Sequence, residues 1–169
     1  AVEICDGENI ELVTSADGTL YEWIGPLGAS PSTLLLSGLT TNTAATSIAP
    51  GHPSYVSGEY RVRVTDANGC TATSDAITIT INPIPSVLAN NDSPVCAGET
   101  ITLQANTVNG ATYRWYDGDP IVMGTTLFSQ NQNPTVANLA AGTHDFFVTV
   151  EVNGCTSPTS MTTVTIYEN

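Results

Sequence analysis

The residues best able to carry chemistry in this 169-residue chain are its four cysteines, Cys5, Cys70, Cys96 and Cys155. A zinc site would need thiolate or imidazole ligands close together, as in Cys-x-x-Cys, and that motif does not occur. In a β-rich chain of low charge, cysteines indicate disulfides formed in an oxidising compartment. Four cysteines allow three pairings.

Carboxylates are the second group with chemical potential. Asp117 and Asp119 flank a glycine after an expected strand, and Ca²⁺ takes six to eight oxygen ligands from loops of this kind. No EF-hand loop or nine-residue calcium repeat occurs. The sequence therefore offers Asp117 and Asp119 as the leading ligands of one calcium ion, against the alternative that they form a turn and aid solubility. No other cofactor is expected.

Catalysis finds little support among the remaining residues. At the places that match His52 and His144, the other half of the chain has no histidine. The Gly-x-Ser-x-Gly motif that carries the nucleophile of many hydrolases does not occur. We therefore expect no catalytic residue and no enzyme activity.

The charge balance removes several classes of function. Sixteen acidic residues stand against three arginines, there is no lysine, and the formal charge is −13. A P-loop and a Schiff-base enzyme both need lysine, and nucleic acids or anionic membranes need a basic face. No apolar run approaches the length of a membrane span, so direct membrane insertion is not expected. The first residues lack the pattern of a signal peptide, and we expect a mature fragment or an excised piece.

An internal repeat organises the whole chain. Four segments recur in the same order: 5–12 as 96–103, 21–23 as 113–115, 57–60 as 141–144, and 68–70 as 153–155. Two prolines at 83 and 85 interrupt an alternating run and predict a semi-rigid linker. The predicted modules are 1–83 and 84–169, with charges of −7 and −6.

The repeat favours one pairing of the cysteines. Each module has one early cysteine and one after an Asn-Gly turn, which predicts the disulfides Cys5–Cys70 and Cys96–Cys155. Each bond would close a loop of about 60 residues, worth about 4 kcal/mol in the chain-entropy model.

Alternation of apolar and polar residues predicts strands throughout. Asn-Gly and Asp-Gly turns separate these runs, and roughly seven short strands per module is typical of an immunoglobulin-like β-sandwich. The predicted fold is all-β, with two tandem sandwiches of about seven strands each. Two Tyr-x-Trp motifs lie in the strand period, so we expect Tyr21, Trp23, Tyr113 and Trp115 in the cores.

Each module follows one pattern, which begins with a segment such as PVCAGETITL (94–103). A Tyr-x-Trp motif comes next, and then a segment such as SGEYRVRVTDANGC (57–70). The modules resemble the Ig-like or PKD-like repeats of giant cell-surface adhesins of Bacteroidetes, including SprB-type gliding-motility adhesins. The resemblance covers both modules. It implies type IX secretion, an extracellular position at the cell surface, and a role in adhesion or gliding motility. It transfers no functional residue.

The leading hypothesis is therefore a non-enzymatic segment of a surface adhesin, acting as a disulfide-stapled stalk. Its expected partners are neighbouring repeats of the same chain, with a polysaccharide or other surface ligand at exposed loops such as the Asn/Gln-rich 130–134. The alternative is a carbohydrate-binding or accessory module of a secreted hydrolase.

Overall fold

The computed structural model describes residues 1–27, 30–41 and 43–168, and the side chains of all of these except 27 and 30–41. The chain divides into two compact units, Ala1–Pro83 and Ile84–Asn169. All regular structure in the described residues is β-strand. Among them there is accordingly no apolar helix of the length that a membrane span requires.

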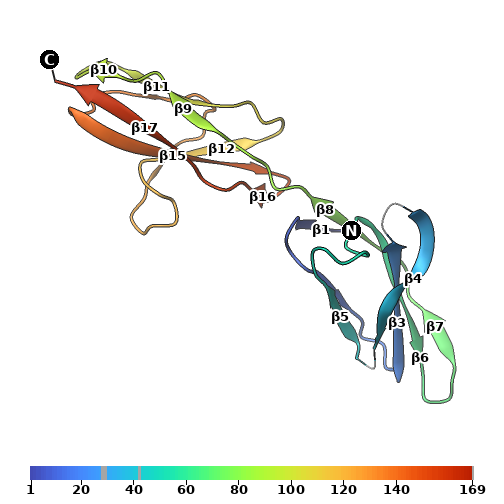
Figure 1. Ribbon diagram of the computed structural model, residues 1–169. Coiled ribbons are helices and arrows are strands. Elements are labelled where there is room, and N and C mark those ends of the chain that lie inside the picture. The colour runs from blue at the N-terminus through green and yellow to red at the C-terminus, as the bar shows by residue number, and fades with distance from the viewer. Residues whose placement is uncertain (28–29, 42, 169) are drawn as a thin grey trace. The chain divides into compact units, whose positions relative to one another are not determined.

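Unit 1 is a sandwich of two sheets (Figure 1). The larger sheet has the order β1-β8-β6-β3-β4, with β7 paired to β6, and the smaller sheet is β2-β5. Parallel pairing of β1 with β8 places the start of the unit beside its last strand. The strands of unit 1 are β1 Val2–Cys5, β2 Ile10–Val13, β3 Leu20–Leu27, β4 Ser30–Thr41, β5 Ala45–Ile48, β6 Gly58–Thr65, β7 Thr71–Thr73 and β8 Ile77–Asn82.

Unit 2 repeats this arrangement and adds one strand. Its larger sheet has the order β10-β17-β15-β12-β13, with β16 paired to β15, and its smaller sheet is β14-β11-β9. The added strand is β9, which has no counterpart among the described strands of unit 1. The strands of unit 2 are β9 Ala89–Asn91, β10 Val95–Cys96, β11 Ile101–Ala105, β12 Thr112–Tyr116, β13 Leu127–Ser129, β14 Thr135–Val136, β15 Gly142–Val152, β16 Cys155–Thr156 and β17 Ser160–Tyr167.

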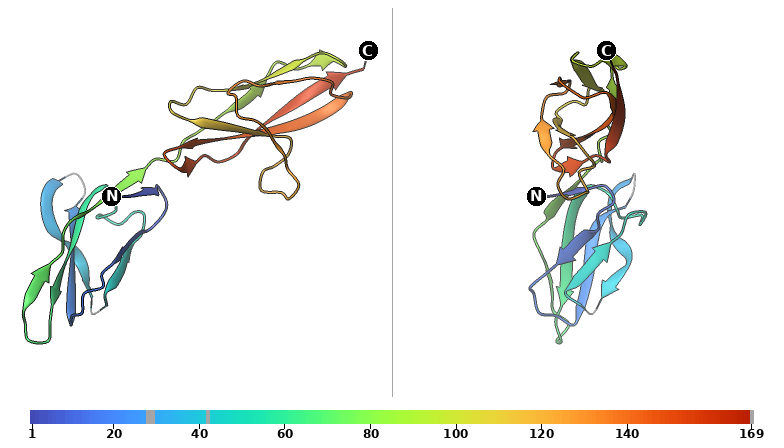
Figure 2. Two further views of the ribbon diagram at one scale, coloured as in Figure 1. Left: turned by 180° about the vertical axis from the view of Figure 1, so that it is seen from behind. Right: turned by 90° about the vertical axis from the view of Figure 1, so that its left-hand side faces the viewer.

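Each core lies between the two sheets of its unit, whose layers can be followed in Figure 2. Side chains on a strand alternate between faces, so every second residue of β6 and β15 points inward. The buried side chains of unit 1 are Ile10, Leu12, Tyr21, Trp23, Ile48, Tyr60, Val62, Val64 and Ile79. Those of unit 2 are Val87, Ile101, Leu103, Ala105, Tyr113, Trp115, Phe146, Val148, Val150, Val164 and Ile166.

The Tyr-x-Trp motifs lie in these cores, and each tyrosine also fixes a turn. The Tyr21 hydroxyl donates to the carbonyl of Ala16 and accepts the N–H of Gly18, both at 3.0 Å. The Tyr113 hydroxyl makes the same two bonds in unit 2, to the carbonyl of Asn106 and from the N–H of Val108. Because a buried hydroxyl needs a partner, this tether lets a tyrosine occupy the core.

Candidate functional site

The two cysteines of unit 1 lie at opposite ends of its larger sheet. Cys5 pairs with Asn82 at the end of β8, beyond the point where Gly58 of β6 pairs with Ile79. Cys70 lies at the other end of β6, where its carbonyl accepts the N–H of Asp66. At about 3.3 Å per residue, the two sites are roughly 30 Å apart along the sheet.

Unit 2 has the same arrangement. Cys96 pairs with Tyr167 beside the start of β15, where Gly142 pairs with Ile166. Cys155 pairs with Val152 at the far end of β15. The length of β15 therefore separates the cysteines by about 30 Å.

Neither predicted disulfide is formed. Cys70 and Cys96 are free and exposed, whereas Cys5 and Cys155 are disulfide-bonded. A disulfide needs its Cα atoms within about 7 Å, which the length of each sheet prevents for Cys5–Cys70 and for Cys96–Cys155. The repeat assigned the cysteines to equivalent places correctly, but it carried no information on which end of a sandwich each place occupies.

Asp117 and Asp119 lie together in the loop after β12, and their carboxylates already have partners. Asp117 accepts the N–H of Thr126 at 2.8 Å, and Asp119 accepts the N–H of Ile121 at 3.1 Å. These bonds are those of turn-forming aspartates. No cluster of three or more His, Cys, Asp or Glu side chains suited to a metal occurs in the described residues. The calcium site stays a prediction.

The two histidines are held by their own loops. His52 Nδ1 accepts the N–H of Ser54 at 3.1 Å, and His144 Nε2 lies 2.8 Å from the carbonyl of Ala140. The bond to a carbonyl requires the proton on Nε2 of His144.

The Asn/Gln-rich loop 130–134 has a structural role that the sequence did not reveal. Gln132 donates through Nε2 to the carbonyl of Ala105 at 2.8 Å, and the backbone carbonyl of Gln132 accepts Trp115 Nε1–H at 3.2 Å. Asn133 accepts the N–H of Ala105 through its side chain. These amides close one edge of the core, so they are engaged within the unit.

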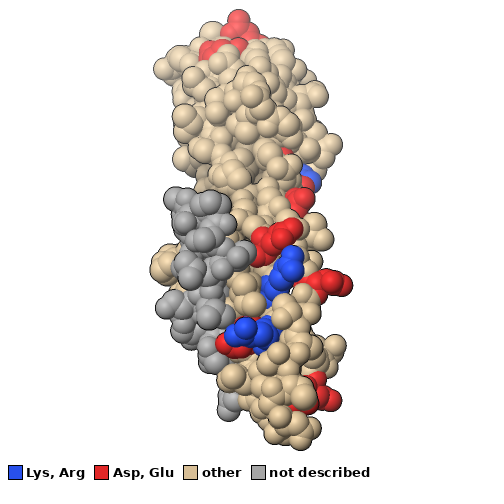
Figure 3. All heavy atoms as spheres, turned by 90° about the vertical axis from the view of Figure 1, so that its right-hand side faces the viewer, with Lys and Arg blue, Asp and Glu red and all other residues tan. Residues whose placement is uncertain are grey.

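All three arginines pair with glutamates. Arg63 binds Glu22 across β3 and β6 with two hydrogen bonds of 2.5 and 2.7 Å, and Arg114 binds Glu151 at 2.7 Å. Arg61 lies 3.6 Å from Glu59. Hydrogen bonding from Arg63, with its charge, lowers the pKa of Glu22 against a smaller opposing effect of desolvation. On the face drawn in Figure 3 the arginine atoms lie beside carboxylates.

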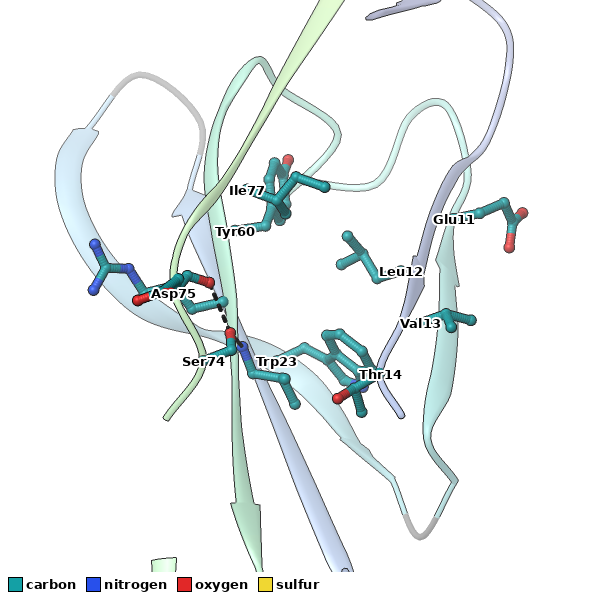
Figure 4. Close-up of a pocket in the computed structure, with 11 residues that line it drawn as sticks. Glu11, Leu12, Val13, Thr14, Trp23, Tyr60, Ser74, Asp75 and Ile77 are labelled. Atoms are coloured by element: carbon teal, nitrogen blue, oxygen red, sulfur yellow. Dashed lines mark hydrogen bonds between the residues drawn. The ribbon is translucent and has the colours of Figure 1, made fainter. Parts of the chain in front are cut away.

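Unit 1 contains a cavity of about 390 Å³ between β2 and the segment leading into β8 (Figure 4). Its lining residues are Glu11, Leu12, Val13, Thr14, Trp23, Tyr60, Arg61, Val62, Ser74, Asp75 and Ile77. Trp23 is 4% exposed, and its Nε1–H has no hydrogen-bond partner in the described structure. The equivalent Trp115 is bonded to Gln132, so the two units differ at this edge.

Comparison with known proteins agrees with this architecture. Residues 84–167 match the family model described as an Ig-like domain, CHU_C associated. The chain therefore has an immunoglobulin-like β-sandwich fold. The family match spans nearly all of unit 2, and unit 1 repeats the same sheet order. No curated protein matches the chain.

Solved structures share the fold at low sequence identity. A fragment of titin aligns with a TM-score of 0.53 at 16% identity, over 100% of this chain and 62% of that chain. The FN1–FN3 domains of chicken CNTN1 align at 0.52 and 11% identity, over 99% and 65%. A marsupial T cell receptor aligns at 0.55 and 10% identity, over 100% and 70%. At such identities the likeness concerns the fold alone. The chain spans about two thirds of the length of these structures.

Proposed function

We propose that the chain is a non-enzymatic segment of an extracellular repeat protein at a cell surface, where it acts as a covalently stapled stalk. The observation that carries the proposal is the position of the cysteines. Each module has one cysteine at each end of its larger sheet, too far apart to bond to each other. Cysteines at the ends of a module suit bonds between successive modules.

Repeat equivalence gives these bonds a direction. Cys5 and Cys96 are equivalent early cysteines, and Cys70 and Cys155 are equivalent Asn-Gly-Cys cysteines. Cys5 and Cys155 are each disulfide-bonded. The rule that we propose for the array joins the early cysteine of one module to the Asn-Gly-Cys cysteine of the following module. Under this rule Cys70 and Cys96, which are free in the structure, would bond to any further module of the same design placed beside them.

The polar side chains of the surface favour a role as a spacer over a role in direct ligand binding. The arginines are paired with glutamates, and the loop amides at 132 and 133 are engaged internally. With charges of −7 and −6, neighbouring modules would repel one another, which opposes non-specific association. Adhesion or gliding motility would then depend on contacts that are weak singly and numerous in an array.

A three-module chain tests this proposal. A second copy of residues 84–169 is appended after residue 169, and the protein is refolded with oxidised glutathione. Two thiols then become one disulfide while one glutathione disulfide is reduced to two thiols. We expect Cys96 to bond to the Asn-Gly-Cys cysteine of the appended copy. A free Cys96 in the folded protein, or a bond within the appended copy, would overturn the rule. A control with Cys96→Ser should leave that appended cysteine free.

A further inference from the structure

In unit 2, β9 closes the edge of the sandwich. It pairs antiparallel with β11, with Leu103 opposite Asn91 and Ala105 opposite Ala89. The N–H of Ala89 donates to Ser160 Oγ at 2.9 Å, and Asn91 Nδ2 donates to Thr162 Oγ1 at 2.6 Å. These bonds connect β9 to the larger sheet. Just before β9, Val87 is 6% exposed and belongs to the core.

Unit 1 has no strand at this edge in the described residues, because β2, the counterpart of β11, pairs only with β5. The registers show which residues correspond. Trp23 pairs with Val62 as Trp115 pairs with Val148, and Tyr60 pairs with Ile77 as Phe146 pairs with Thr162.

Counting along the last strand, Asp75 then occupies the place of Ser160, and Ile77 that of Thr162. The early repeat places residues 12–14 where β11 carries 103–105. These residues all line the cavity of unit 1. The hollow is therefore the space that β9 fills in unit 2.

The shape and chemistry of this space suit a strand. The cavity of about 390 Å³ adjoins another of about 150 Å³ that shares Thr14, Val62 and Ser74, and we call the two together the groove of unit 1. Figure 4 shows Ser74 and Asp75 across from Leu12, Val13 and Thr14 of the β2 segment. Ser74 Oγ accepts the N–H of Val62 and donates to the carbonyl of Asp75. Leu12 and Val62 make its floor apolar. Asp75 supplies an acceptor where Ser160 receives the N–H of β9.

We propose that the groove of unit 1 is the seat of an added β-strand. Its occupant is an extended polypeptide segment of the chemistry of residues 84–91, with small apolar side chains at alternate positions. The segment runs antiparallel to β2 and donates a backbone N–H to Asp75. Main-chain bonds to a free strand edge supply affinity, and the apolar pockets select the side chains. The proposal rests on comparison of the two units and is independent of the surface role proposed above.

The test adds the segment in its expected register. Residue 92 corresponds to residue 1, so a copy of residues 84–91 is fused directly before Ala1 of the full chain. Hydrogen exchange by mass spectrometry then follows amides of 11–14 and 74–77. We expect exchange to slow by about tenfold or more, as for edge amides that become paired. Asp75→Ala in the fused chain should reverse part of this protection.

The matched control carries Val87→Asp and Ala89→Asp in the copied segment only, which leaves unit 2 untouched. It should show no protection. Fused chains that exchange like the parent chain would overturn the proposal, and so would equal protection by both fusions, because any attached chain would then suffice. If the unfused chain forms a dimer that protects the same amides, the occupant is a second copy and the proposal is also overturned.

Discussion

The difference between the two sandwich edges predicts unequal costs for one mutation made at equivalent places. Leu12 of β2 and Leu103 of β11 are both buried, at 4% and 0% exposure. Leu103 is covered by β9, whereas Leu12 already lines a cavity. Truncation to alanine removes the same atoms from both cores, so the comparison isolates the surroundings.

Leu→Ala in a core costs about 2–5 kcal/mol, made up of a transfer contribution and a contribution from the cavity left behind. At Leu103 a new closed void forms, and we expect a loss of about 4 kcal/mol. At Leu12 the deleted atoms enlarge a space that already exists, and we expect about 2 kcal/mol. The difference of about 2 kcal/mol means that Leu103→Ala should raise the unfolding equilibrium constant of unit 2 roughly 30 times more than Leu12→Ala raises that of unit 1.

Native-state hydrogen exchange measures the two units separately in the same chain. Peptides from β6 report the opening of unit 1, and peptides from β15 report that of unit 2. Leu12→Ala should affect only the first set, and Leu103→Ala only the second. Equal losses, or a larger loss for Leu12→Ala, would refute the argument that β9 closes unit 2 while the same edge of unit 1 is open.

Two further predictions use other contrasts between the units. Trp115→Phe removes a donor bonded to the backbone carbonyl of Gln132 and should destabilise unit 2 by about 1–3 kcal/mol. Trp23→Phe removes a donor without a partner and should destabilise unit 1 by less, as measured by urea titration with hydrogen exchange of each unit as the readout. Equal costs would contradict the difference in hydrogen bonding between the two tryptophans. Arg63→Gln should raise the pKa of Glu22, measured by carboxyl NMR titration. The folded-state pKa of Glu22 lies below its ordinary value, so the ion pair stabilises the fold at pH values above that ordinary pKa. The stabilisation is lost as the pH falls through the folded-state pKa. If Arg63→Gln still destabilised the protein in full below the folded-state pKa, the loss would not come from this ion pair.

The sequence was sufficient for the fold because its signals are local and repeated. Alternation around Tyr60 and Phe146 and the two Tyr-x-Trp motifs predicted strands that bury one face, and sandwiches form as a result. The linker prolines marked a change of module at the place where the structure divides the chain.

The disulfide pairing failed because it depends on the direction in which strands run. Cys5 and Cys70 lie in one module, and their spacing is similar to that of the equivalent cysteines in the other module. Strand β6 nevertheless runs the length of the sheet between them, so they lie at opposite ends. The open edge could not be predicted either, because residues 89–91 have weak strand character in sequence. No local signal marks the edge of β2 at which the described residues of unit 1 place no strand. Gln132 looked like an exposed amide because sequence cannot show that its side chain donates to the Ala105 carbonyl, or that its backbone carbonyl accepts Trp115 Nε1–H.

The most direct test of the account is a peptide map of the native chain, made without reduction and after alkylation of free thiols. The account predicts that Cys70 and Cys96 are alkylated, and that the peptides containing Cys5 and Cys155 are disulfide-bonded and escape alkylation. Disulfides Cys5–Cys70 and Cys96–Cys155 in the folded protein would contradict it, because each would close a module on itself and leave no cysteine for a neighbour.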